Sequence, residues 1–218
     1  MARVIFHIDA NSAFLSWTAA HRVLILGEQE DLREIPSAVV GNKTSRHSII
    51  LAKSVPAKRY GIHTGEPLFQ ALEKCPNLKV VEPDYGLYVE CSRHMVTLLR
   101  QVAPAVEQYS IDEAWADMTG TESLYGPPVQ AAEMLRERIY QELGFTVNIG
   151  VSCNKLLAKM AGELEKPNKV ITLFPQELSR KLWPLPVGEL FMVGRATTPK
   201  LHAMGIHTIG DLAKADPA

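Results

Sequence analysis

Cysteine is scarce in this sequence, and the few that occur are far apart. There are three, Cys75, Cys91 and Cys153, an odd number with no Cys-x-x-Cys pair, which excludes a disulfide framework and a cysteine-based zinc site. The seven histidines show no His-x-x-x-His spacing, so we interpret each as structural or solvated. The pattern indicates reduced thiols in a cytoplasmic protein.

Long apolar runs and a surplus of positive charge are also missing. No run approaches the ~20 residues of a membrane span, and the first residues lead directly into a strand instead of a signal peptide. We therefore expect a cytoplasmic protein with no membrane partner. The formal net charge of −1 is not typical of a chain that grips nucleic acid strongly by itself. With 218 residues, the chain can bury a substantial core in one or two domains.

Two adjacent carboxylates, Asp112 and Glu113, stand in an apolar and aromatic stretch that predicts strands on both sides. Burying such a pair is costly unless a positive charge neutralises it. In a flat strand the two side chains would point to opposite faces, so both reach one cation only if the chain turns or bulges at Ser110–Glu113. The alternative is a solvated hairpin tip with two exposed acids, and the pair alone does not decide.

A third carboxylate, Asp9, ends a short buried strand near the start of the chain. Asn11 and Ser12 follow as a cap-like pair that opens an apolar helix. Beside the hairpin tip, Asp9 would complete an all-oxygen site of the kind that Mg²⁺ prefers. Metal ions held by acids are the usual device for in-line phosphoryl transfer.

The motifs then fall in an order that resembles the Y-family (UmuC/DinB-like) translesion DNA polymerases. They are Asp9 with Phe14, then Tyr109-Ser110-Ile111-Asp112-Glu113, then Asn154-Lys155 through Lys166-Pro167-Asn168. The resemblance covers nearly the whole chain. It implies a DNA-directed DNA polymerase, a nucleotidyltransferase that copies a template past damaged bases in DNA repair and damage tolerance.

The predicted elements give an α+β fold with an insertion. Without residues 13–83, the chain reads as a strand followed by α-β-β-α-β, which predicts a ferredoxin-like sheet with the acids at strand ends. The resemblance names the parts: a palm at 1–12 and 84–173, small fingers at 13–83 and a partial thumb at 174–218. We expect strands at 4–8, 36–40, 47–52, 78–81, 145–151 and 170–173, and helices at 12–26, 55–61, 67–74, 85–102, 128–143 and 154–164.

The last segment resembles a helix-hairpin-helix, two short helices joined by a glycine turn. Such hairpins present backbone N–H groups to a DNA phosphate, so the resemblance makes Gly194, Arg195 and Gly205 candidate DNA contacts. The alternative is a plain αα-hairpin packed on the palm. The family usually has Pro-Gly-Ile-Gly where this chain has Phe191 to Gly194, which weakens the case for close phosphate approach. Because family members continue into a little finger domain, we expect an N-terminal fragment with little activity alone.

The resemblance also assigns roles at the metal site. Asp9, Asp112 and Glu113 would hold two Mg²⁺ ions, for which Mn²⁺ can substitute, and Ala10 would serve the second ion through its backbone carbonyl. One ion lowers the pKa of the primer 3′-hydroxyl, and the other neutralises the triphosphate and the leaving pyrophosphate. Asn11 stands where some members carry another acid and is not counted as a ligand.

The nucleotide contacts follow from the same resemblance. Phe14 stands at the steric gate that excludes a 2′-hydroxyl, although a phenylalanine at helix spacing is usually a core residue. Lys166 and Lys58 would reach the triphosphate, the alternative for Lys58 being a solvated helix face. Ser54-Val55 replace the usual Asn-Tyr, which removes a phosphate-contacting hydroxyl. Lys155 and Lys159 share a helix face that either supports DNA or phosphate or is solvated.

The expected partners are primer-template DNA and dNTPs, with a sliding clamp as a candidate partner through residues beyond Ala218. Two rival functions come from other classes. A nucleotide cyclase shares the palm-like fold and two-metal chemistry, but the helix-hairpin-helix and the position of Phe14 argue against it. A catalytically inactive polymerase-like adaptor in a mutagenesis complex would lack acids at the metal positions, whereas all three are present here.

Overall fold

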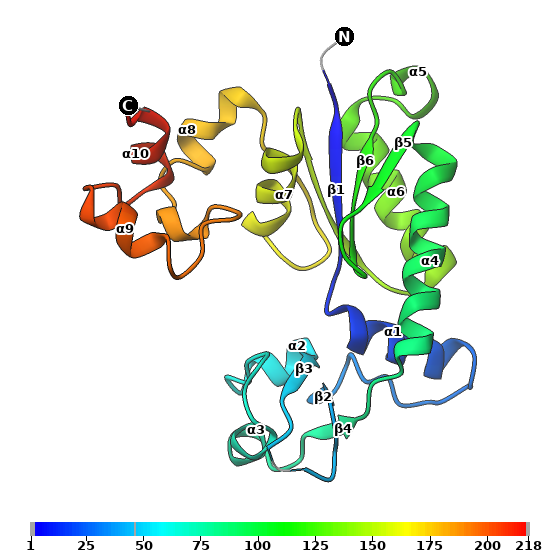
Figure 1. The fold of residues 1–218 in the computed structure, drawn as a ribbon. Coiled ribbons are helices and arrows are strands. Elements are labelled where there is room, and N and C mark those ends of the chain that lie inside the picture. Colours follow the sequence, from blue (N-terminus) through cyan, green and yellow to red (C-terminus); the bar gives the residue numbers. More distant parts are fainter. Residues whose placement is uncertain (1–2, 46, 217–218) are drawn as a thin grey trace.

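A computed structural model describes residues 3–45 and 47–216 of the chain. Its larger sheet has five strands in the order β5-β6-β1-β7-β8, with β1 at the centre (Figure 1). Strand β1 pairs antiparallel with both β6 and β7, and β8 runs parallel to β7. The strands are β1 (Ile5–Ala10), β5 (Ala105–Gln108), β6 (Glu113–Asp117), β7 (Val147–Ser152) and β8 (Val170–Thr172).

The two faces of this sheet are covered by different helices. Side chains alternate along β1, so neighbouring residues of the strand pack against different helices. Phe6 and Ile8 enter the main core with residues of α4 (Tyr85–Val102) and α6 (Pro128–Leu143). Ile5 faces the other way and packs with Ala158 of α7 (Lys155–Leu164). The connection β1-α4-β5-β6-α6-β7 confirms the predicted ferredoxin-like order. A short helix, α5 (Glu122–Tyr125), precedes α6 and was not predicted.

Helix α7 lies unusually close to the sheet at two glycines. A Cβ atom added to Gly150 of β7 would stand 1.9 Å from the carbonyl oxygen of Ala158, so no side chain fits there. Gly162 of the helix faces the same contact, with the Nδ1 atom of His7 3.6 Å from an added Cβ. The backbone contact fixes the height of α7 above the sheet, and therefore the positions of the side chains between them.

A smaller unit is inserted between β1 and α4, as predicted, and Figure 1 places it beyond the end of β1. Its sheet has the order β3-β2-β4 and its own core, which includes Val40, Ile50 and Leu68. The first helix of the segment ends at Leu24, two residues before the predicted end, and Ile25 and Leu26 are exposed. The elements are α1 (Ala13–Leu24), β2 (Ser37–Val40), β3 (Ile50–Lys53), α2 (Val55–Lys58), α3 (Leu68–Lys74) and β4 (Lys79–Val81).

The C-terminal segment packs on the open side of α7, where Met160 and Ala161 meet Leu182 and Ile209. The predicted pair of short helices with a glycine turn is present as α9 and α10, joined through Gly205 with a positive φ of 76°. Within the part of the chain described, no helix is long and apolar enough to cross a membrane. The segment contains η1 (Pro175–Glu177), α8 (Leu178–Lys181), η2 (Val187–Glu189), α9 (Thr198–Ala203) and α10 (Ile209–Lys214).

Candidate active site

Asp9 and Glu113 are direct cross-strand partners in the antiparallel pair of β1 and β6. Residues that stand opposite each other in such a pair project to the same face of the sheet. Helix α7 covers that face. Ile5, which lies four residues before Asp9 and so on the same face of β1, packs against Ala158 of this helix. The register therefore brings two of the three predicted metal ligands to one end of one face.

Asp112 joins them because the hairpin between β5 and β6 is irregular. The backbone N–H groups of Tyr109 and Ser110 both donate to the carbonyl oxygen of Glu113, at 3.0 and 3.2 Å, which is the pattern of a β-bulge. The hydroxyl of Ser110 donates to Asp112 Oδ1 at 2.7 Å, and the Asp112 carbonyl accepts from the N–H of Ala10 at 3.0 Å. The predicted turn or bulge at this tip is confirmed.

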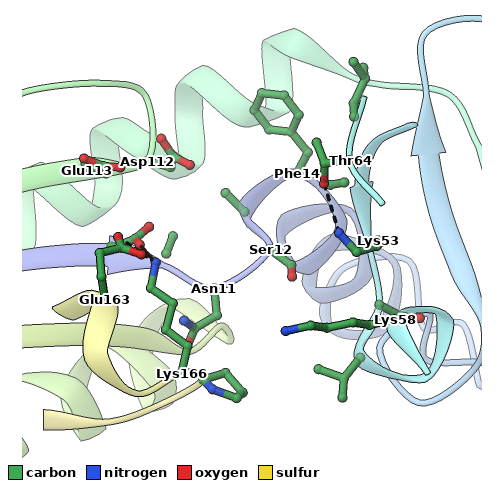
Figure 2. Close-up of a pocket in the computed structure, with 18 residues that line it drawn as sticks. Asn11, Ser12, Phe14, Lys53, Lys58, Thr64, Asp112, Glu113, Glu163 and Lys166 are labelled. Carbon is green, nitrogen blue, oxygen red and sulfur yellow. Dashed lines mark hydrogen bonds and ion pairs between the residues drawn. The ribbon is translucent and has the colours of Figure 1, made fainter. Parts of the chain in front are cut away.

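All three acids line one pocket between the two sheets (Figure 2). Its acidic wall consists of Asp9, Asp112, Glu113, Glu163 and Lys166, which come from the ends of β1 and β6, from α7 and from the loop after α7. Its basic wall consists of Lys53, Lys58 and Thr64, which come from the inserted unit on the opposite side. Ala10 and Phe14 line the pocket where β1 gives way to α1.

Asp9 is nearly buried and is bound by a lysine. Lys166 Nζ donates to Asp9 Oδ2 at 2.5 Å and to Glu163 Oε1 at 2.9 Å. Burial raises the pKa of Asp9, and the charge and hydrogen bond of Lys166 only partly offset it. Although burial disfavours its ammonium, the charge of Asp9 and the bonds to both acids raise the pKa of Lys166. The lysine predicted to contact the triphosphate thus lies on the acidic wall in this structure.

Glu113 has two basic partners, both at Oε2. Lys159 Nζ donates to it at 2.6 Å and His7 Nε2 at 3.2 Å. Burial opposes ionisation of Glu113, but these bonds and charges outweigh it and lower its pKa to about 2. Lys159 is buried, and its ammonium lies 5.7 Å from the ring centre of Tyr109 and 5.1 Å from that of Phe191. The expectation of a solvated face is wrong for Lys159, because the side chain is buried against Glu113. Its alternative role, support of DNA or phosphate, stays a prediction.

His7 was missed as a site residue because isolated histidines were set aside. It is completely buried, Nε2 faces Glu113, and Nδ1 has no hydrogen-bond partner among the residues that the structure describes. Since a carboxylate only accepts, Nε2 carries the proton. The available signal was spacing: His7 precedes Asp9 by two strand positions, so both lie on the same face.

The acids fit a metal ion by their chemistry, since carboxylate oxygens are the donors that Mg²⁺ takes. The raised pKa of Asp9 means that Lys166 alone does not offset the cost of burying this carboxylate, so further positive charge would be favourable there. As the side chains stand, no group of three acidic, histidine or cysteine residues within 3–45 and 47–216 is arranged to hold one ion. The positive charge beside Asp9 and Glu113 comes from Lys166 and Lys159.

Phe14 combines the two alternatives set out for it. Its ring stacks on Tyr88 with centroids 4.4 Å apart and planes 4° from parallel, and Tyr85 meets it edge-on at 6.1 Å. The ring is only half-buried and also lines the pocket. Packing against α4 holds the ring in place at the pocket wall, so the core role and the gate role do not exclude each other.

Comparison with known proteins identifies the family. The chain matches the family described as impB/mucB/samB over residues 8–163, which is most of its length. The chain belongs to the impB/mucB/samB family. Residues 175–206 match a second description, the helix-hairpin-helix motif of the same family. These matches confirm the predicted family and the predicted helix-hairpin-helix.

Among relatives of this impB/mucB/samB chain, DNA polymerase IV of Clostridium acetobutylicum is 53% identical over 99% of the chain and 54% of its own length. DNA polymerase IV 1 of Bacillus subtilis is 40% identical over 99% of the chain and 50% of its own length. The chain thus spans about half the length of the curated relatives it matches.

Two solved structures share the fold. DinB from Sulfolobus solfataricus is 25% identical with a TM-score of 0.81, covering 98% of this chain and 60% of its own. A Y-family DNA polymerase chimera of Dbh and Dpo4 is 25% identical with a TM-score of 0.84, covering 97% and 61%. The α+β palm with an inserted unit is confirmed as the architecture of this family member.

The three predicted DNA contacts of this family member lie in two places. Gly194 and Arg195 line a shallow surface hollow next to Thr198 and His202. Gly205 lies beyond α9, outside that hollow. Before Gly194, the family's usual glycine is replaced, and Met192 takes a positive φ of 76° that side chains rarely adopt. The contact role of these three residues stays a prediction.

Proposed function

We propose that this chain is the catalytic part of a DNA polymerase that transfers nucleotides from dNTPs to a primer 3′-hydroxyl, past damaged template bases. The observation that carries the proposal is the placement of Asp9, Asp112 and Glu113 on one wall of a pocket whose other wall is basic. Relatives named DNA polymerase IV support the reaction class. We assign residues 1–12 and 84–173 to the palm, 13–83 to the fingers and 174–218 to a partial thumb.

Asp9, Asp112 and Glu113 would hold two Mg²⁺ ions, with Ala10 contributing its backbone carbonyl and Mn²⁺ able to substitute. Bound ions of this kind activate the attacking hydroxyl and neutralise the leaving pyrophosphate. Because its pKa is about 2, Glu113 is ionised at neutral pH and ready to act as a ligand. Lys166 neutralises Asp9 in this structure, so its proposed contact with the triphosphate requires it to leave that carboxylate.

The proposed steric gate is Phe14. Its ring is held between α1 and α4 by the stack on Tyr88 and reaches the pocket, so it could exclude a 2′-hydroxyl without moving. Lys58 on the basic wall is the proposed phosphate contact of the fingers. Gly194, Arg195 and Gly205 are proposed to contact the DNA backbone. A sliding clamp is a further proposed partner, and work on DNA in the bacterial cytoplasm implies association with the nucleoid.

Primer extension tests this function on the whole protein that contains the chain. We expect dNTP-dependent extension of a primed template with Mg²⁺, and extension opposite a damaged base. An intact fold with no extension would support an inactive adaptor instead. Formation of a cyclic nucleotide from a triphosphate would support the cyclase.

A further inference from the structure

The two walls of the pocket differ in how their charges are neutralised. On the acidic wall, Lys166 is bound by Asp9 and Glu163. On the basic wall, the described residues place no carboxylate oxygen within 4.0 Å of the ammonium of Lys53 or Lys58, although ion pairs are found for many other lysines. Two lysines thus face a pocket without a counter-ion from the described chain.

Lys53 is placed there by the strand it ends. In β3, buried residues alternate with half-buried ones, so Leu51 and Lys53 share the face that lines the pocket. The Lys53 ammonium donates one hydrogen bond, to Thr64 Oγ1 at 3.1 Å. An ammonium has three donors, so two remain for a ligand. Figure 2 shows Lys53 held by Thr64 and Lys58 extending into the cavity beside it.

The electrostatics of Lys53 fit a binding role better than a packing role. Burial lowers its pKa and the nearby charge of Lys58 lowers it further, while Glu66 acts in the opposite sense. Glu66 is already bound by Lys74 Nζ at 2.5 Å. An anion between Lys53 and Lys58 would relieve both the desolvation and the repulsion, since both disfavour the charged ammonium.

We propose that Lys53 binds phosphate oxygens of the incoming nucleotide, forming with Lys58 a two-lysine clamp on the basic wall of the pocket. This inference rests on the proposed function, since it gives that site a further triphosphate contact. The ligand is a polyphosphate, for which a lysine serves as a compact positive charge. The clamp supplies positive charge on the wall where Val55 lines the pocket with an apolar side chain.

The test measures by calorimetry how tightly the chain binds inorganic tripolyphosphate in the presence of Mg²⁺. Lys53→Met, which keeps the length of the stem and removes the charge, is expected to weaken binding about tenfold or more, the worth of one charge-assisted hydrogen bond. Lys53→Arg is expected to bind within about threefold of the wild type, because the charge is kept. The matched control is Arg59→Met, an exposed cation beside Lys58 that does not line the pocket, with no change expected.

Two further measurements separate the possible failures. A short single-stranded oligonucleotide without a triphosphate distinguishes nucleotide phosphates from the DNA backbone: equal loss of its binding in Lys53→Met would overturn the nucleotide assignment. If Lys53→Met binds tripolyphosphate as tightly as the wild type while Lys58→Met does not, the proposed role of Lys53 is wrong and its ammonium only packs on Thr64. If primer extension fails while tripolyphosphate binding still depends on Lys53, the clamp stands and the polymerase proposal falls.

The kinetic signature is a split between KM and kcat. In the whole protein, Lys53→Met should raise the KM for dNTP about tenfold while DNA binding is unchanged. A thermal melt of each variant checks the fold. Should Lys53→Met unfold, Lys53→Gln, which also removes the charge but keeps a polar side chain beside Thr64, replaces it. Tripolyphosphate binding by Lys53→Gln as tight as that of the wild type would overturn the clamp.

Discussion

The charges on the acidic and the basic wall of the pocket are neutralised in different ways. On the acidic wall, two carboxylates have basic partners from the fold: Lys166 binds Asp9, and Lys159 and His7 bind Glu113. The basic wall has two lysines, Lys53 and Lys58, for which the described residues supply no ion pair. Asp9 and Glu113 are therefore tied into the fold as well as into the proposed metal site, whereas the described residues leave the charges of Lys53 and Lys58 to a ligand.

The difference also separates stability from function. Residues that neutralise the acidic wall should affect folding when they are replaced, because they leave a carboxylate uncompensated. Residues of the basic wall should affect binding and leave folding almost unchanged.

The largest effect is expected at Asp112, the acid with no lysine partner within the described chain. Asp112→Asn should reduce primer extension by at least about 10²–10³-fold, because one group that stabilises developing charge is lost. The measurement is single-turnover extension with a melting curve. Glu163→Gln, in the same wall but outside the proposed metal set, is the control and should retain most activity. Near-normal extension by Asp112→Asn would place the chemistry elsewhere.

Phe14→Ala tests the gate against the core. Loss of a steric barrier should let rNTPs be incorporated at least about tenfold more readily, each 1.4 kcal/mol being a factor of ten, while dNTP incorporation falls much less. Truncating a fully buried phenylalanine would instead cost about 3–5 kcal/mol, and the half-buried ring of Phe14 should cost less. The assay compares rNTP with dNTP incorporation beside a melt. A variant that melts early and still rejects rNTPs would make Phe14 a core residue.

Lys159 and Lys155 provide a matched pair on one helix. Lys159→Met leaves Glu113 without its lysine and should cost about 1–3 kcal/mol in the free energy of unfolding. Lys155 pairs with Glu107 in an exposed position, so Lys155→Met should cost about 0–1 kcal/mol. Urea unfolding of both variants measures the difference. Equal losses would mean that the buried pair contributes no more than a surface pair.

A pH dependence of opposite sign is expected at the two cross-strand acids. The folded pKa of Glu113, about 2, lies below its ordinary value of 4.5, so its contribution is present above pH 4.5 and is lost as pH falls toward 2. Glu113→Gln should flatten the stability profile in that window. The pKa of Asp9 is raised, so Asp9→Asn should be the more stable protein at neutral pH. Urea unfolding between pH 2 and 7 checks both signs.

The part of the site that sequence predicted is the part that depends on local pattern. The acids followed from strand ends and from the need to bend the chain at Ser110–Glu113, which the bulge confirmed. Their partners are long-range: Lys159 is 46 positions from Glu113, and Lys166 is 157 from Asp9. Hydrophobic periodicity in a sequence does not indicate such long-range pairs. Lys53 was missed because the direction of its side chain depends on how β3 packs.

The fold shows the same division. Long periodic segments such as α4 and α6 were predicted with their ends; in the structure Asp84 caps the start of α4, and Gly144 with a positive φ ends α6. The short helices α5, η1 and α8 were missed, since three or four residues carry no periodic signal. Helix α1 was extended to Leu26 because apolar residues continue past its end, although Ile25 and Leu26 are exposed.

Lys159 also contacts the C-terminal segment, through the ring of Phe191. Phe191 belongs to the C-terminal segment, yet its ring covers the ammonium that holds Glu113, and it meets Tyr109 of the hairpin edge-on at 5.9 Å. Lifting Phe191 away would hydrate the ammonium and loosen its hold on the carboxylate. By thermodynamic reciprocity, whatever draws Glu113 from Lys159 must loosen Phe191 by the same free energy. The packing of the C-terminal segment and the charge state of the acidic hairpin are therefore coupled through the hydration of one ammonium group.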